Sequence, residues 1–117
     1  MLLIKKIIII IFLNIFIQTS LYAKTTTWIC QSERFGNFIW EYDDNFIYQK
    51  FPADDVRKFK ITKDHRKSGL SIYGTSKGSI FDLDAYMDFQ DMYVKVRQVD
   101  REFGFSGEYT DTNCKTY

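Results

Sequence analysis

Two cysteines have the most specific chemistry in this chain. Cys30 and Cys114 stand near the two ends of the segment that remains when an N-terminal leader is removed. In an oxidising compartment an even pair of this kind predicts one disulfide, and the alternative is two free thiols. Closing so long a loop is worth about 4.6 kcal/mol in the chain-entropy description. We therefore expect a covalent link between the first and last parts of the fold.

The first 23 residues have the composition of an export signal. Two lysines precede a run from Ile7 to Ile17 that is apolar apart from Asn14, and the segment ends in Ala23, a small residue suited to signal peptidase. A retained membrane anchor is the alternative, but a spanning helix needs about 20 apolar residues and this run is shorter. We predict a cleaved signal peptide over 1–23 and a monomeric domain over 24–117, secreted to the periplasm or the cell exterior. Contact with the membrane is expected only transiently, through the signal peptide.

The sequence offers little that could catalyse a reaction. The single histidine, His65, lies in a polar cluster typical of a turn, and no glycine-rich phosphate loop, nucleophile elbow or dinucleotide fingerprint is present. Nothing in the spacing of the acidic residues favours the paired carboxylates of glycosidases. We assign no catalytic residue, zinc site or cofactor, and we expect a noncatalytic protein.

Four aspartates lie within ten residues: Asp82, Asp84, Asp88 and Asp91. Closely spaced carboxylates are the ligands that calcium takes, although this pattern lacks the glycine and the terminal glutamate of an EF-hand loop. A solvated acidic face or a turn cap is the other interpretation. Calcium is thus an alternative hypothesis for this segment and not our main one.

Basic residues are concentrated between positions 57 and 67. A strand here would place Lys58 and Lys60 on one face, with further cations toward the following turn. Such a stripe could hold lipid headgroups, acidic glycans or an acidic protein cleft. The alternative is a charged edge that discourages strand pairing. The candidate anion-binding residues are Lys58, Lys60, Lys63, Arg66 and Lys67.

Overall charge argues against nucleic acid as the partner. Removing the leader takes away Lys5 and Lys6, which leaves 14 of the 16 basic residues against 15 acidic ones, a net charge of about −1. A nucleic-acid binder needs a basic excess. Most of the aromatic residues remain, and each can bury roughly 150–250 Å². We expect them to fill the core of a single small domain.

Strand signals dominate residues 24–117, and no segment carries a helical apolar stripe. A brief helix is expected over 52–58, which begins with proline, and a turn over 74–78. Seven or eight strands predict an all-β antiparallel meander, either a barrel or a sandwich; we favour a barrel because closure removes exposed edges. Alternation of apolar and polar residues predicts strands over 25–31, 37–42, 46–51, 58–63, 70–73, 79–83, 93–99 and 103–109, with a closing segment at 113–115.

Two small polar turns, Ser68-Gly69 and Ser76-Lys77-Gly78, flank the segment that contains Tyr73. With an export signal, an early Cys and a late Cys, these motifs resemble the bacterial C-type lysozyme inhibitor family of small exported β-barrels. The resemblance implies that Ser68, Gly69 and Lys77 contact the active-site cleft of a lysozyme. Tyr73 is only loosely equivalent to the family's tyrosine, because it lies one position further along the chain.

We expect a binding or interaction protein that presents turns to a partner. Inhibition of a cell-wall hydrolase such as lysozyme is one version of this hypothesis. The alternatives are a lipocalin-like carrier of an apolar ligand and a structural protein of the cell envelope. A filled interior is expected over a cavity, because eight strands leave about enough room for side chains alone.

Overall fold

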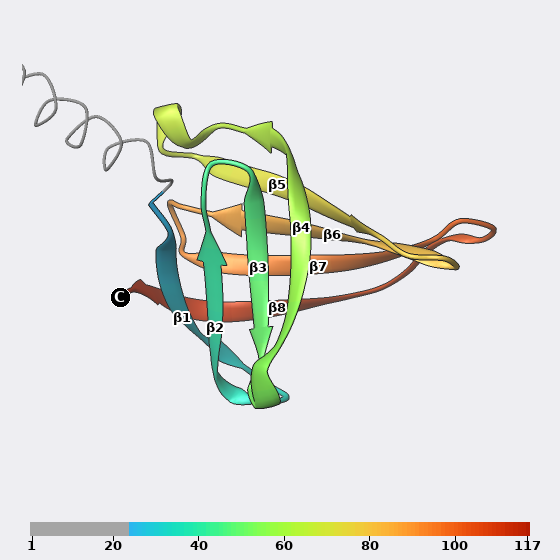
Figure 1. Ribbon diagram of the computed structural model, residues 1–117, viewed down its shortest axis with the longest axis horizontal. Coiled ribbons are helices and arrows are strands. Elements are labelled where there is room, and N and C mark those ends of the chain that lie inside the picture. The colour runs from blue at the N-terminus through green and yellow to red at the C-terminus, as the bar shows by residue number, and fades with distance from the viewer. Residues whose placement is uncertain (1–23) are drawn as a thin grey trace, which may run out of the picture.

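The computed structural model describes residues 24–117, which fold as an antiparallel β-structure (Figure 1). The signal peptide expected over 1–23 lies outside the described residues. Within the described part, no helix is long and apolar enough to cross a membrane. The elements are β1 Thr26–Ser32, β2 Gly36–Tyr42, β3 Phe46–Phe51, the 3-10 turn η1 Pro52–Asp54, β4 Asp55–Asp64, the 3-10 turn η2 Arg66–Ser68, β5 Ser71–Lys77, β6 Phe81–Asp88, β7 Tyr93–Asp100 and β8 Gly104–Thr116.

The sheet closes on itself. Each strand pairs with the next along the chain, and β8 returns to pair with β1, so the strand order is a closed meander. The closing seam is short, running from Trp28 opposite Thr116 to Gln31 opposite Thr112, with a bulge between. The all-β prediction is confirmed, and of the two forms considered the chain adopts the barrel.

Strands β5 to β8 continue past the closed part of the barrel as a four-stranded extension. β4 pairs with β5 only as far as Lys60 opposite Thr75, and β8 pairs with β1 only from Thr112 onward. The ladders among β5, β6, β7 and β8 run on to their hairpin turns. Figure 1 shows the β5–β6 and β7–β8 hairpins projecting together, away from β1 and the C-terminus.

Alternate residues of the strands point inward and fill the barrel, as the period of two requires. Trp28, Trp40 and Phe59 are each exposed by 2% or less. Eight strands enclose about the space that side chains of this size occupy. The buried core consists of Trp28, Cys30, Phe38, Trp40, Ile47, Phe59, Ile72, Leu83, Ala85, Met87, Val94, Val96 and Cys114.

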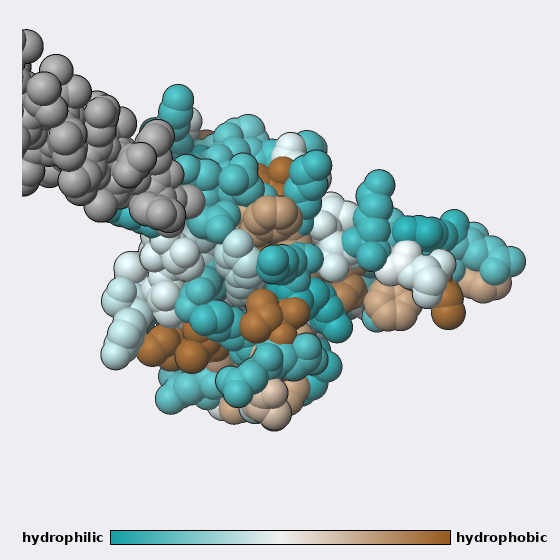
Figure 2. Space-filling model, viewed as in Figure 1, coloured by the Kyte–Doolittle hydropathy of each residue, from teal (hydrophilic) through white to brown (hydrophobic). Residues whose placement is uncertain are grey.

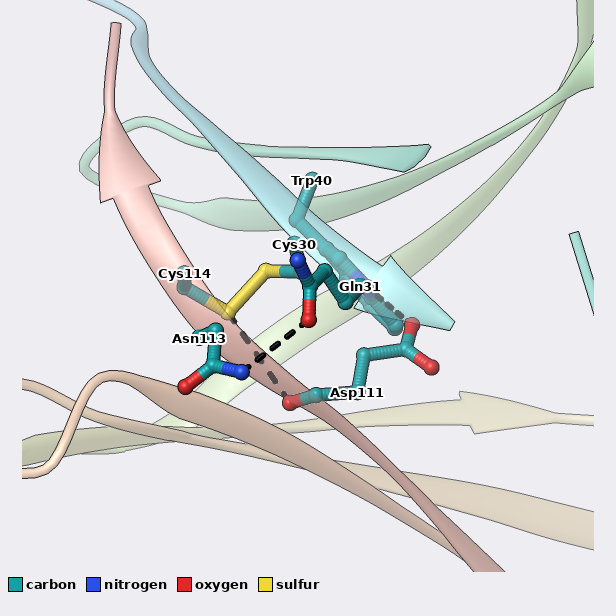
Figure 3. Close-up of a disulfide and its surroundings, with 6 residues drawn as sticks. All are labelled: Cys30, Gln31, Trp40, Asp111, Asn113 and Cys114. Atoms are coloured by element: carbon teal, nitrogen blue, oxygen red, sulfur yellow. Dashed lines mark hydrogen bonds between the residues drawn. A yellow bond between two sulfur atoms is a disulfide. The ribbon is translucent and has the colours of Figure 1, made fainter. Parts of the chain in front are cut away.

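The predicted disulfide joins the two strands of the seam. Cys30 on β1 and Cys114 on β8 are bonded, with their Cα atoms 4.0 Å apart (Figure 3). Both residues are buried. On the outside of the same seam, Asn113 Nδ2 donates a hydrogen bond of 3.0 Å to Gln31 Oε1. The cross-link and this bond hold the first and last strands together where their ladder is short.

Inside the barrel the seam also carries a polar pair. Trp40 Nε1 donates to Asp111 Oδ2 at 2.8 Å. Burial raises the pKa of Asp111, and the hydrogen bond from Trp40 acts in the opposite direction. The sulfur of Cys114 lies 3.9 Å from the Asp111 carbonyl oxygen (Figure 3), which is a van der Waals contact because a disulfide sulfur carries no hydrogen. Nearby, Gln49 Nε2 donates to Tyr109 Oη at 2.6 Å.

The helix expected over 52–58 is wrong beyond its first turn. Ala53 and Asp54 have φ values of 66° and 61°, in the left-handed region, so the backbone cannot continue a right-handed helix. From Asp55 onward the chain pairs with β3 instead. The acids that favoured a helix start belong to a tight corner between two strands.

The turn expected over 74–78 is also wrong, because β5 runs on through Ser76 to Lys77. Gly74 is a packing residue: a Cβ there would lie 2.9 Å from the Cβ of Phe59, so the glycine allows β4 and β5 to approach closely. The turn falls at residues 78–80. Two later strands are longer than expected, since β6 extends to Asp88 and β8 includes the closing segment 113–115.

Candidate functional site

Three tyrosines from neighbouring strands lie side by side on the outside of the sheet. Tyr73 of β5 stands directly opposite Tyr86 of β6, and their ring centroids are 4.6 Å apart. The ring of Tyr93 on β7 lies 5.8 Å from that of Tyr86. Each tyrosine occupies an outward position because its strand neighbours, such as Ile72 and Val94, point into the core. We call these three residues the tyrosine surface.

Three cations border the tyrosine surface. Lys63 Nζ lies 5.8 Å from the ring centroid of Tyr73, in the range of a cation–π contact. Lys95 stands opposite Tyr86 in the β6–β7 ladder, and Arg97 follows on the same side of β7. Within residues 24–117, none of these three cations takes part in an ion pair. They are therefore available to an anion.

Burial keeps the phenols of Tyr86 and Tyr93 protonated at neutral pH. Burial, followed by a hydrogen bond to Asp88, raises the pKa of Tyr86 to about 12. The Tyr86 hydroxyl donates to Asp88 Oδ2 at 2.9 Å. Burial likewise raises the pKa of Tyr93. Burial by itself would raise the pKa of Asp88 as well, but hydrogen bonds from the Asp91 amide, the Tyr86 hydroxyl and the Gln90 amide lower it. A neutral phenol next to a charged carboxylate results.

The three tyrosines and the three cations line an open hollow of about 520 Å³. Its polar wall contains Asp84 and Glu108, and Thr75 Oγ1 donates to Asp84 Oδ1 at 2.8 Å. Small-molecule sites fall in the range of roughly 300–1,000 Å³ and combine apolar surface with a few placed polar groups. The hollow therefore combines aromatic faces, cations and carboxylates that can accept hydrogen bonds from hydroxyl groups.

The five residues predicted to form an anion-binding stripe lie in three different places in the structure. Lys63 borders the hollow. Lys58 and Lys60 are exposed on the outer side of β4, as expected from their alternation with Phe59. Lys58 Nζ lies 5.7 Å from the ring centroid of Phe46 on the adjacent strand.

The two other members of the stripe lie in the turn after β4. Arg66 is engaged internally: it forms an ion pair of 2.5 Å with Asp64 and donates to the backbone carbonyls of Asp43 and Asp44. The hydrogen bonds from Arg66 lower the pKa of Asp64 to about 2. Lys67 is exposed beside it. Arg66 therefore ties this turn to the β2–β3 turn, a structural role that the sequence did not predict.

The residues that carry the lysozyme-inhibitor resemblance do not form one surface. Ser68 and Gly69 lie in the turn before β5, and Lys77 is the last residue of that strand. From Ser71 to Lys77 an extended strand covers about 20 Å. Tyr73 lies between them and belongs to the tyrosine surface.

The four aspartates considered for calcium are spread along β6 and the turn after it. Asp82 pairs with Arg101 at 3.0 Å, whereas Asp88 accepts the backbone N–H groups of Gln90 and Asp91 and so caps the turn. Among residues 24–117, no group of three or more His, Cys, Asp or Glu side chains is placed to hold a metal ion. The calcium hypothesis thus gains no support from their arrangement.

Sequence reasoning missed Tyr86, Tyr93, Lys95 and Arg97. All four lie at outward positions of β6 and β7, where they alternate with Ala85, Val94 and Val96. The alternation could have identified each of these residues as outward-facing, but only one strand at a time. Their proximity depends on the register between strands, which the sequence pattern does not specify.

Comparison with known proteins gives no match: no family model, no curated protein and no solved structure is significantly similar to this chain.

Proposed function

We propose that residues 24–117 form an exported, noncatalytic binding domain whose tyrosine surface binds an acidic saccharide. The observation that carries this proposal is the hollow in which three adjacent tyrosines meet three cations without ion-pair partners. The disulfide fits export to an oxidising compartment.

Each kind of group in the hollow has a counterpart in an acidic sugar. A tyrosine ring has an apolar face, which packs against the C–H face of a pyranose, and a polar hydroxyl. Lys63, Lys95 and Arg97 can pair with carboxylates of the ligand. Asp84 and Glu108 can accept hydrogen bonds from sugar hydroxyls. The mixture of charges therefore suits a hydroxyl-rich anion better than a simple inorganic one.

A carrier function receives less support. The interior of the barrel is occupied by large side chains such as Trp28, Trp40 and Met87, which are exposed by 2% or less. A ligand of appreciable size would have to displace them at a large cost in packing. The candidate site is therefore on the outside of the sheet.

The proposal is tested by calorimetric titration with a hexamer of galacturonic acid and, in parallel, a neutral hexamer of glucose. We expect the acidic hexamer to bind and the neutral one to bind more weakly. Tyr73→Ala and Lys95→Ala should each weaken binding by about fivefold, equivalent to about 1 kcal/mol. Tyr117→Ala and Lys115→Ala are matched controls, because both residues are exposed and lie outside the hollow. No binding of the acidic hexamer, or equal losses in the controls, would refute the proposal.

A further inference from the structure

The far end of the extension exposes four large apolar side chains. Exposure is 82% for Phe103, 68% for Ile80, 56% for Phe105 and 37% for Phe81. They come from the β5–β6 and β7–β8 turns and the strand ends beside them, and Figure 2 shows apolar surface at this end of the molecule. We call these four residues the apolar tip.

The apolar tip is built on two ordered turns. The Asp100 carboxylate accepts the backbone N–H groups of Glu102 and Phe103, at 2.8 and 3.0 Å, and Gly104 takes a left-handed φ of 82°. In the other hairpin, the Gly78 N–H donates to the Phe81 carbonyl at 3.1 Å. These bonds hold the exposed side chains at the end of the extension.

Arg101 joins the two hairpins. Its guanidinium pairs with Asp82 at 3.0 Å, and its backbone N–H donates to the Ile80 carbonyl at 3.3 Å. The two turns are thereby held next to each other. The tip acts as one unit with apolar side chains from both hairpins.

The core packing of residues 24–117 does not account for these apolar side chains, none of which belongs to the core cluster. Phe35, another exposed aromatic, packs against Phe38 and Phe51 at the edge of the core, with centroids 5.6 and 6.1 Å away. No aromatic ring of the described residues pairs in this way with Phe81, Phe103 or Phe105, which do not belong to the core cluster. Exposed apolar surface that does not support the fold indicates a binding surface.

We propose that the apolar tip inserts into the interface of a lipid bilayer. Taking side-chain areas of roughly 150–250 Å², its exposed surface is about 500 Å², below the roughly 800 Å² per partner of a stable protein interface. The tip is also the convex end of a projection, a shape that enters a soft apolar layer without a preformed pocket. Apolar side chains with cations behind them are typical of interfacial insertion.

The charges near the tip determine which membrane it should bind. Lys77, Arg97 and Arg101 lie close to the apolar side chains, and Arg97 stacks over the Phe105 ring at 5.0 Å. Their charge is balanced by Asp82, Asp100 and Glu102. Insertion should therefore depend on apolar burial and little on the charge of the lipid.

Vesicle sedimentation tests the proposal, using phosphatidylcholine vesicles with and without a quarter of phosphatidylglycerol. We expect residues 24–117 to sediment with both. Replacing two tip residues in the Ile80→Ser/Phe103→Ser variant should lower the partition coefficient about tenfold or more, because two apolar side chains lose their burial. The control is Val56→Ser/Leu70→Ser, which replaces two residues that are 43% exposed elsewhere on the barrel.

A second measurement follows insertion directly. Trp28 and Trp40 are exposed by only 2% and 0%, so a Phe103→Trp variant adds the one indole in residues 24–117 that vesicles can reach. Its emission should shift to the blue when vesicles are added. Absence of sedimentation and of this shift would overturn the proposal in favour of a protein partner, and equal losses in tip and control variants would also overturn it. The saccharide titration is independent, so either proposal can fail without the other.

Discussion

Reducing the disulfide should lower the free energy of unfolding of residues 24–117 by about 4.6 kcal/mol. The bond joins Cys30 and Cys114 across 84 positions. In the chain-entropy description a loop of that length restricts the unfolded chain by about 15 cal/mol/K, which gives this value near 298 K. Small domains have a total stability of roughly 5–15 kcal/mol. The reduced protein should therefore be near the limit of folding.

Urea unfolding followed by tryptophan fluorescence measures the effect, because Trp28 and Trp40 are buried in the native state. Oxidised and reduced wild-type protein have the same side chains, so their difference isolates the cross-link. The Cys30→Ala/Cys114→Ala variant should be less stable than the reduced protein, since it also loses two buried sulfur atoms. A loss below about 1 kcal/mol on reduction, the size of one net hydrogen bond, would refute the reasoning. The β1–β8 ladder would then hold the seam without the bond.

Other consequences can be checked with single substitutions. Trp40→Phe removes the N–H that the buried Asp111 accepts and should cost about 1–3 kcal/mol in urea unfolding, so an unchanged midpoint would contradict that role. The pKa of Asp64 is about 2, below its ordinary value, so this carboxylate stabilises the fold above about pH 4 and the effect is lost as pH falls through 2. Asp64→Asn should therefore lower Tm at about pH 6 and leave it nearly unchanged at about pH 2, and an equal effect at both would exclude the linkage. If the lysozyme-inhibitor resemblance applies, residues 24–117 should slow lysis by a C-type lysozyme; Ser68→Tyr and Lys77→Ala should then relieve inhibition additively, because they lie at opposite ends of β5. An unchanged rate of lysis in the presence of the wild-type protein would refute the lysozyme-inhibitor hypothesis.

Much of the barrel could be predicted because its signals are local. Trp28 and Cys30 alternate with exposed or half-buried neighbours, as Phe59 does with Lys58 and Lys60, and this period of two identifies strands and their inner faces. The even cysteine pair at the two ends of the domain then favoured closure.

The errors arose where local preferences competed with pairing between strands. Pro52 and the acids after it favour a helix start, yet the chain from Asp55 pairs with β3. Gly74 was interpreted as a turn residue, whereas it is needed for the contact with Phe59. The tyrosine surface depends on the register that sets Tyr73 opposite Tyr86, a property of the folded sheet. Composition could not supply that information.

Strands β5 to β8 carry the apolar tip and most of the tyrosine hollow, to which β4 adds Lys63, and this arrangement separates binding from stability. Their inward residues, such as Ala85 and Val96, are anchored in the core, while Tyr86 and Lys95 on the same strands face outward. Along β6, Tyr86 lies five positions after Phe81 at the tip, a distance of about 17 Å. A bilayer that takes up the tip would thus leave Tyr86 in water, while Arg97, which lines the hollow and lies over the Phe105 ring, stands between the two surfaces. The tip lies on the extension, whereas the three tyrosines lie beside the closed part of the barrel, where Tyr73 pairs with Lys63 of β4. A saccharide bound there would stay on the barrel side of a membrane that takes up the tip, while the disulfide maintains the fold.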